Sequence, residues 1–189
     1  SEGSNRNGSG GGNKADSGSS NKKKAGGIPL EKLRFQVGEH QAENFDRLRR
    51  HLASQAQREC GKEMAYIMDN LEEFNHVAPR LKTATDEEAK QSLIAEGTAE
   101  ADQTSSMRNA EKDRLNKEYE KTYEKQLKRW DKKIVKYEND KELLCGMIME
   151  KVAPSVETKL EEQDDFKAHK LDDPVKLLKE IQTVCTTHK

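Results

Sequence analysis

The sequence predicts an all-α protein, a helical bundle with one long central helix that follows a disordered N-terminal tail. Over 115–152, apolar residues recur at steps of three and four, which keeps one face of a helix apolar. The chain has only four prolines, and most of its 12 glycines lie before residue 28. Charged residues make up 37% and hydrophobic residues 32%, so we expect only part of the chain to build a core.

Composition also limits the compartment and the partners. The net charge of -1 gives no general argument for nucleic-acid binding over the whole chain. Cys60, Cys145 and Cys185 are far apart, without metal-binding spacing, which is typical of reduced thiols in a cytosolic or nuclear protein. With no apolar run of about 18 residues and no signal-peptide pattern, we expect no transmembrane helix and a cytoplasmic location.

Residues 1–27 are rich in Gly, Ser and Asn and are predicted to be disordered, because they offer too little apolar surface to offset the entropy of ordering. Lys22, Lys23 and Lys24 form a small basic cluster inside this tail. The cluster is a candidate RNA contact, although a solvated run of charge is the simpler interpretation of three lysines alone.

Residues 28–78 are predicted to form an N-terminal helical segment. The period-two alternation of 33–37 indicates a short extended stretch that Gly38 ends. Helices are then predicted over 39–59 and 62–76, separated at Gly61, with Pro79 as the stop signal. Their apolar faces consist of Phe45, Leu48, Leu52 and Ala56 in the first helix, and Met64, Ile67, Met68, Leu71 and Phe74 in the second.

Residues 79–107 are predicted to form a polar connector that packs weakly. Thr85 and Glu88 have the spacing of a capping box, which predicts a short helix from there to about residue 95. Only Ala89, Leu93 and Ile94 give this helix an apolar side.

Residues 108–189 are predicted to hold the long helix and the C-terminal helices. The long helix has a narrow apolar stripe up to Tyr137 and is apolar nearly all round from Leu143, so we expect it to be half exposed and half buried. Trp130 is expected to be largely buried against helix 62–76 or the last helix. Pro154 should end the long helix and open a new one, and Asp172 or Asp173 with Pro174 should open the last.

No catalytic constellation appears in the chain. The motifs GxSxG, P-loop and HExxH are absent, and the five histidines are scattered. His169 lies near Glu161, Glu162, Asp164 and Asp165, but nothing completes a coordination set, and a solvated acidic run is the simpler interpretation. We therefore expect no enzyme activity and no cofactor or metal, and assign the chain to binding or assembly.

The chain resembles a known family over roughly 33–185. The resemblance rests on the segment LRFQV at 33–37, WDKKIVKY at 130–137, LLCGMIM at 143–149, VETKL at 156–160 and DPVKLLKEI at 173–181. This order is similar to the N-terminal part of the Gag-like region of copia-type retrotransposons, especially those of algae such as diatoms. The resemblance implies an all-helical capsid-type domain that associates with further copies of itself into particles around RNA.

Two hypotheses follow. The first is the Gag-like capsid protein, and the alternative is a cellular coiled-coil or adaptor protein that pairs through the long helix. The apolar steps from Tyr123 to Ile148 run 4-3-4-3-7-4, which interrupts a heptad seam, and aromatic residues in the seam favour packing inside a domain. The partners expected are further copies of the chain and RNA, with no membrane. The candidate core and assembly residues are Leu127, Trp130, Ile134, Tyr137, Leu144, Ile148, Leu178 and Ile181.

Overall fold

The computed structural model describes residues 28–187, and its fold is all-α with one long central helix, as the sequence predicts. The predictions for the tail at 1–27 and for Lys22, Lys23 and Lys24 lie outside the described residues. The helices are α1 (Gln41–Glu59), α2 (Lys62–Asn70), α3 (Asp86–Ala95), α4 (Ser105–Met149), α5 (Pro154–Glu161), α6 (Phe166–His169) and α7 (Pro174–Thr187). Two short 3-10 helices, η1 (Leu30–Lys32) and η2 (Glu100–Asp102), complete the order.

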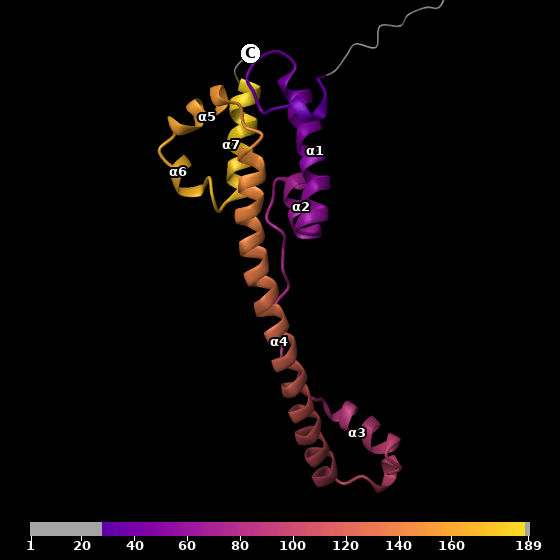
Figure 1. Cartoon of the computed structure of the whole chain (residues 1–189). Helices are drawn as coiled ribbons and strands as arrows, with labels where there is room; N and C mark the ends of the chain where they lie inside the picture. Colours follow the sequence, from indigo (N-terminus) through magenta and orange to yellow (C-terminus); the bar gives the residue numbers. More distant parts are fainter. Residues whose placement is uncertain (1–27, 188–189) are drawn as a thin grey trace, which may run out of the picture.

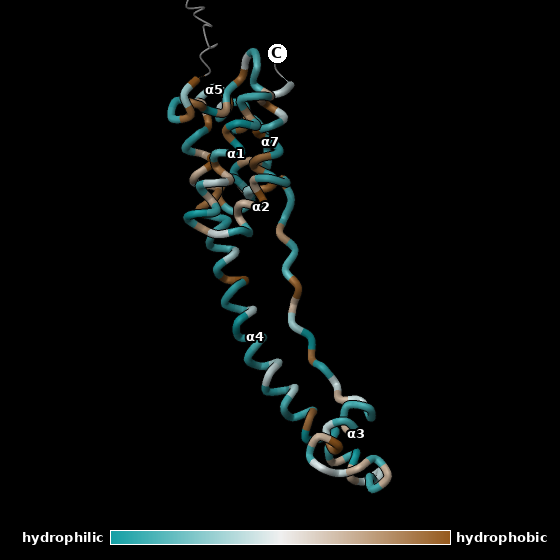
Figure 2. The backbone as a smooth tube through the Cα atoms, turned by 90° about the vertical axis from the view of Figure 1, so that its right-hand side faces the viewer, coloured by the Kyte–Doolittle hydropathy of each residue, from teal (hydrophilic) through white to brown (hydrophobic). Residues whose placement is uncertain are grey.

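The molecule is elongated because α4 extends well beyond the other helices (Figure 1). We call the wide end the head: it contains residues 28–70, the α4 residues 137–149, and residues 150–187. The shaft is the middle of α4, residues 119–136, with the extended segment 71–85 running beside it. The tip, at the far end, consists of α3, η2 and the first turns of α4, residues 86–118. Hydrophobic residues gather in the head, while the shaft is mostly hydrophilic (Figure 2).

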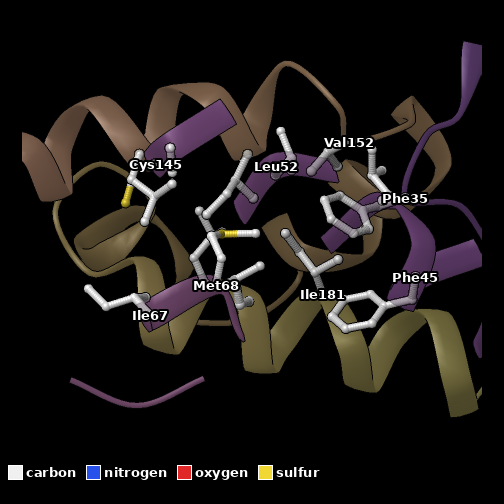
Figure 3. Close-up of a cluster of buried hydrophobic side chains, with 14 of the residues drawn as sticks. Phe35, Phe45, Leu52, Ile67, Met68, Cys145, Val152 and Ile181 are labelled. Carbon is white, nitrogen blue, oxygen red and sulfur yellow. The ribbon is translucent and has the colours of Figure 1, made fainter. Parts of the chain in front are cut away.

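The head holds the main hydrophobic core. The apolar faces of α1, α2 and α7 meet the last turns of α4, and side chains from all of these elements interdigitate (Figure 3). The most deeply buried members include Leu48, Leu52, Ile67, Leu144, Ile148, Leu177, Leu178 and Ile181, each 0% exposed. At about 25 cal/mol per Å² of apolar area, this contiguous burial is the main stabilising contribution in the molecule.

The extended stretch predicted at 33–37 fastens the N-terminal segment to the end of α4. Phe35 and Val152 form an isolated parallel β-bridge, in which the Phe35 N–H donates to the Lys151 carbonyl at 2.8 Å. The Ala153 N–H donates to the Phe35 carbonyl at 2.9 Å. The Phe35 ring is buried beside the Phe45 ring, with centroids 5.2 Å apart, so the bridge also adds to the core.

Three helix starts agree with their predicted signals. The Thr85 hydroxyl accepts from the Glu88 N–H at 3.2 Å, which caps α3. Pro154 is the first residue of α5, and α4 ends before it. The Asp173 carboxylate accepts from the Lys176 N–H at 3.0 Å at the start of α7, which settles the choice between Asp172 and Asp173.

Two predicted boundaries were wrong. The helix predicted over 62–76 ends at Asn70, because Leu71 adopts a left-handed conformation with φ 53° and its N–H closes the last turn on the Ile67 carbonyl. Phe74 therefore belongs to the extended segment. The long helix starts earlier than predicted, at Ser105, where the Thr104 hydroxyl accepts from the Met107 N–H. The residues predicted as a weakly packed connector thus supply the extended segment, α3 and the first turn of α4.

Candidate assembly surface

The eight candidate residues separate into two groups along the molecule. The buried group lies in the head core and consists of Tyr137, Leu144, Ile148, Leu178 and Ile181. The partly buried group lies on the shaft and consists of Leu127, Trp130 and Ile134. The packing expected for Trp130 was wrong: it is partly buried outside the head core, where the extended residues 77–79 lie beside it rather than helix 62–76 or the last helix.

The extended segment, rather than a helix, covers the apolar stripe of the shaft. Val77, Ala78 and Pro79 face Trp130 across a shallow hollow of about 410 Å³, which Gln126, Arg129 and Lys133 complete. Val77 is 80% exposed, so the segment shields the stripe without building a core around it. Among the described residues, the Trp130 indole N–H has no hydrogen-bond partner. The shaft is therefore a thin, two-element layer with side chains accessible on most of its surface.

Tyr137 marks the junction of head and shaft. Its hydroxyl accepts from the Phe74 N–H at 3.1 Å and donates to the Glu73 carboxylate. Its ring packs edge to face on the His76 ring, with centroids 4.5 Å apart. Burial, followed by the Glu73 contact, raises the pKa of Tyr137, and burial lowers the pKa of His76. Both rings are therefore neutral near pH 7. The contacts of Tyr137 with Glu73, Phe74 and His76 hold the start of the extended segment against α4.

The tip is held by polar contacts around Glu111, which is only 6% exposed. The Ser92 hydroxyl of α3 donates to its carboxylate at 2.6 Å, and the Arg114 Nε donates to it at 3.0 Å. Arg114 also contacts Glu118 at 2.7 Å. The hydrogen bonds from Arg114 and then Ser92 lower the pKa of Glu111. The ionised carboxylate is therefore favoured, and it accepts the hydrogen bonds of the network.

Further contacts fix α3 along α4. Lys112 pairs with Asp86 at 2.6 Å, and the Asn116 side chain accepts from the Ala84 N–H at 2.7 Å. Glu88 pairs with Lys82 at 2.8 Å and accepts from the Tyr119 hydroxyl at 2.9 Å. The Lys82 and Tyr119 contacts lower the pKa of the Glu88 carboxyl. The tip thus uses directional bonds where the head uses apolar burial.

The outer face of α7 was the other surface predicted for assembly. Lys176, Lys179 and Gln182 are exposed there, while the opposite face is buried in the head. His169 of α6 is buried and contacts the Glu180 carboxylate at 2.5 Å, which ties α6 to α7 rather than to the acidic run before it. The outer face of α7 is therefore a polar, accessible surface on a well-supported helix.

The three thiols are buried in the head, and none forms a disulfide. Burial raises the pKa of Cys145 to about 12 and that of Cys185 to about 11, which leaves both protonated and weakly nucleophilic. Over residues 28–187, no group of three or more His, Cys, Asp or Glu side chains is arranged to hold a metal ion. Within the same span, no helix is long and apolar enough to cross a membrane.

Sequence reasoning missed Glu111 and Arg114, the central residues of the tip. Their spacing of three places them on one helix face, but that spacing is common among charged residues and does not reveal that Ser92 lies opposite.

Comparison with protein-family models, with curated proteins and with solved structures found no match for this chain.

Proposed function

We propose that this chain is a structural protein of the Gag-like capsid type that assembles with copies of itself into particles around RNA. The observation that carries the proposal is the 45-residue helix α4, whose middle third stands clear of the head and is covered on one side only. A monomer gains little stability from such a shaft. The exposed faces of the shaft are instead available for contacts with neighbouring copies.

The distribution of the candidate residues supports this proposal. The apolar head folds around its own core and so presents polar surfaces, including the outer face of α7. Exposed apolar side chains are scattered rather than gathered in one large patch, with Val135 at 61%, Leu143 at 60% and Leu171 at 64%. Such a surface favours several modest contacts that act together over a tight single interface.

The alternative, a coiled-coil adaptor, requires the apolar seam of α4 to be free for a partner helix. In the monomer, residues 71–85 lie against that seam beside Trp130, and Tyr137 is already buried. A partner helix would have to displace the extended segment and break the Tyr137 contacts with Glu73 and Phe74. This arrangement favours self-assembly through the outer faces.

Sedimentation across a concentration series, followed by electron microscopy with added RNA, tests the proposal. We expect the weight-average mass to rise steadily with concentration, and particles to form when RNA or a crowding agent is added. The adaptor alternative instead predicts a dimer at low micromolar concentration that dissociates in Ile134→Asp. A monomer at every concentration, with no particles on adding RNA, would falsify the capsid proposal.

A further inference from the structure

The middle of α4 concentrates positive charge. Residues 121–136 contain seven basic residues and two acidic ones, although the whole chain has a net charge of -1. Four of the basic residues follow one another at steps of 4, 3 and 4, namely Lys125, Arg129, Lys132 and Lys136. At 3.6 residues per turn, these steps keep the four side chains within an arc of about 60°. We call this row the basic face of the shaft.

No acidic side chain interrupts the centre of the basic face. On a helix surface, the neighbours of a residue lie three and four positions away along the chain. For Lys125, Arg129 and Lys132, every residue at these distances is basic or neutral. Lys121 and Lys128 do have acidic neighbours at these distances, so we leave them out of the face. The positive potential of the three central residues is therefore not cancelled along the helix.

The basic face is exposed and mostly unpaired. Lys125, Arg129 and Lys132 are exposed and, among residues 28–187, have no ion-pair partner. Lys136, at the head end of the face, is exposed and pairs with Asp140. Three cations in a row thus remain available.

Cations at the two ends of α4 are used differently. In the tip, Lys112 pairs with Asp86 at 2.6 Å, and in the head Lys141 pairs with Glu73 at 3.2 Å. These pairs fasten α4 to neighbouring segments of the chain. The three central cations of the basic face make no such pair among the described residues. Their charge is available to a partner from outside the chain.

A row of like charges along a rod is complementary to a chain of repeated opposite charge. Nucleic acid is such a chain, because each nucleotide adds one negatively charged phosphate. Lysine presents a point charge rather than a pattern of donors and acceptors that reads bases, so binding should not depend on base sequence. A membrane-binding helix needs its apolar side free, whereas residues 77–79 lie beside Trp130 on that side of the shaft. These features favour a nucleic-acid backbone over a lipid surface.

We propose that the basic face binds the phosphate backbone of RNA. The inference rests on the proposed function, in which particles form around RNA, and names the surface that contacts the RNA. With about three or four phosphate contacts, a single copy should bind weakly and be sensitive to salt. Many copies on one RNA bind it together, so RNA binding and assembly reinforce each other.

Neutralising the central cations tests the contact. The face variant carries Lys125→Gln, Arg129→Gln and Lys132→Gln, which removes three charges from the basic face. A head control removes three charges at exposed residues without ion pairs among the described residues: Arg50→Gln, Arg58→Gln and Lys62→Gln.

A second control, the tail variant, replaces the other candidate RNA contact, Lys22, Lys23 and Lys24, with glutamine. Circular dichroism and thermal unfolding check that every variant folds as the wild type does.

Fluorescence anisotropy of a labelled single-stranded uridine oligomer measures RNA binding, at protein concentrations below those at which sedimentation detects assembly. We expect the face variant to bind about tenfold or more weakly than the wild type. The slope of log affinity against log salt should become shallower by about 2, since each phosphate contact on a single strand contributes about 0.7. The head control should bind as the wild type does.

Equal affinity of the face variant and the wild type would overturn the contact, and a loss in the tail variant alone would move it to Lys22, Lys23 and Lys24. An equal loss in the head control would assign binding to net charge. Tighter binding of poly-glutamate, or of vesicles that contain phosphatidylserine, would assign the face to an acidic protein or to a lipid surface instead.

Binding and assembly are measured separately, so the two proposals can fail separately. If RNA binds through the basic face but the wild type stays monomeric with and without RNA, the capsid function is wrong and the contact stands. If the wild type assembles but does not bind RNA, the contact is wrong and self-assembly stands without RNA.

Discussion

At its C-terminal end, α4 contributes Leu144, Cys145 and Ile148 to the head, and at its N-terminal end it contributes Glu111 and Arg114 to the tip. The first three side chains are fully buried among apolar neighbours. The other two hold α3 through hydrogen bonds to Ser92 and to each other. The same helix thus relies on non-directional burial at one end and on directional, charge-dependent bonds at the other. We expect the head to resist acid and the tip to respond to it.

The largest effect should come from truncating the head core. Leu144→Ala removes a side chain that is 0% exposed and leaves a cavity, so the free energy of unfolding should fall by about 2–5 kcal/mol. Urea denaturation followed by circular dichroism measures this loss. A change below about 1 kcal/mol would mean that the head does not depend on this core.

Acid should loosen the tip before the head. The folded-state pKa of Glu111 is lowered, so its contribution is present above the ordinary value of 4.5 and is lost as the pH falls through the folded pKa. Hydrogen exchange should therefore show α3 amides losing protection below about pH 4.5 while α7 amides keep theirs.

A matched variant isolates the Glu111 carboxylate. Glu111→Gln should reduce the protection of α3 near pH 7 by about tenfold and flatten its pH dependence, since a hydrogen bond to a charged group contributes about 1.5–3 kcal/mol. Equal pH dependence in the variant and the wild type would assign the acid response to Asp86 or Glu88 instead.

Truncating a side chain in the shaft should lower the free energy of unfolding less than truncating one in the head core. Trp130→Ala should cost about 1–2 kcal/mol, below the 3–5 kcal/mol of a fully buried tryptophan, because the indole is only partly buried beside 77–79. Chemical denaturation followed by circular dichroism compares it directly with Leu144→Ala. A loss as large as that of Leu144→Ala would show that the shaft is packed as tightly as the head.

The smallest effect has the opposite sign. Gly146 lies inside α4, is exposed, and has no atom within 4 Å of the position that a Cβ would take. Gly146→Ala should therefore stabilise the head by about 0.5–1 kcal/mol through helix propensity alone. A higher midpoint of thermal unfolding would show this, and a lower one would mean that a neighbouring group needs the space.

Local signals predicted much of this fold. The cap at Thr85, the break at Pro154 and the start at Pro174 were readable because each depends on a few neighbouring residues. The end of α2 was not, because Phe74 continues the apolar spacing while the left-handed Leu71 turns the backbone away. The surroundings of Trp130 and of Glu111 depend on segments about 20 to 50 residues distant, which spacing within one helix does not report.

The single helix that joins head and tip also acts as a lever. At 1.5 Å per residue, 45 residues span about 68 Å, and the bridge of Phe35 to Val152 anchors the chain just beyond the head end of that span. A tilt of only about 5° at the anchored end would sweep the tip through about 6 Å over this length. Small adjustments in how the last turns of α4 sit in the head therefore become large displacements at the far end, and in the proposed shell such displacements would change the curvature without unfolding a subunit.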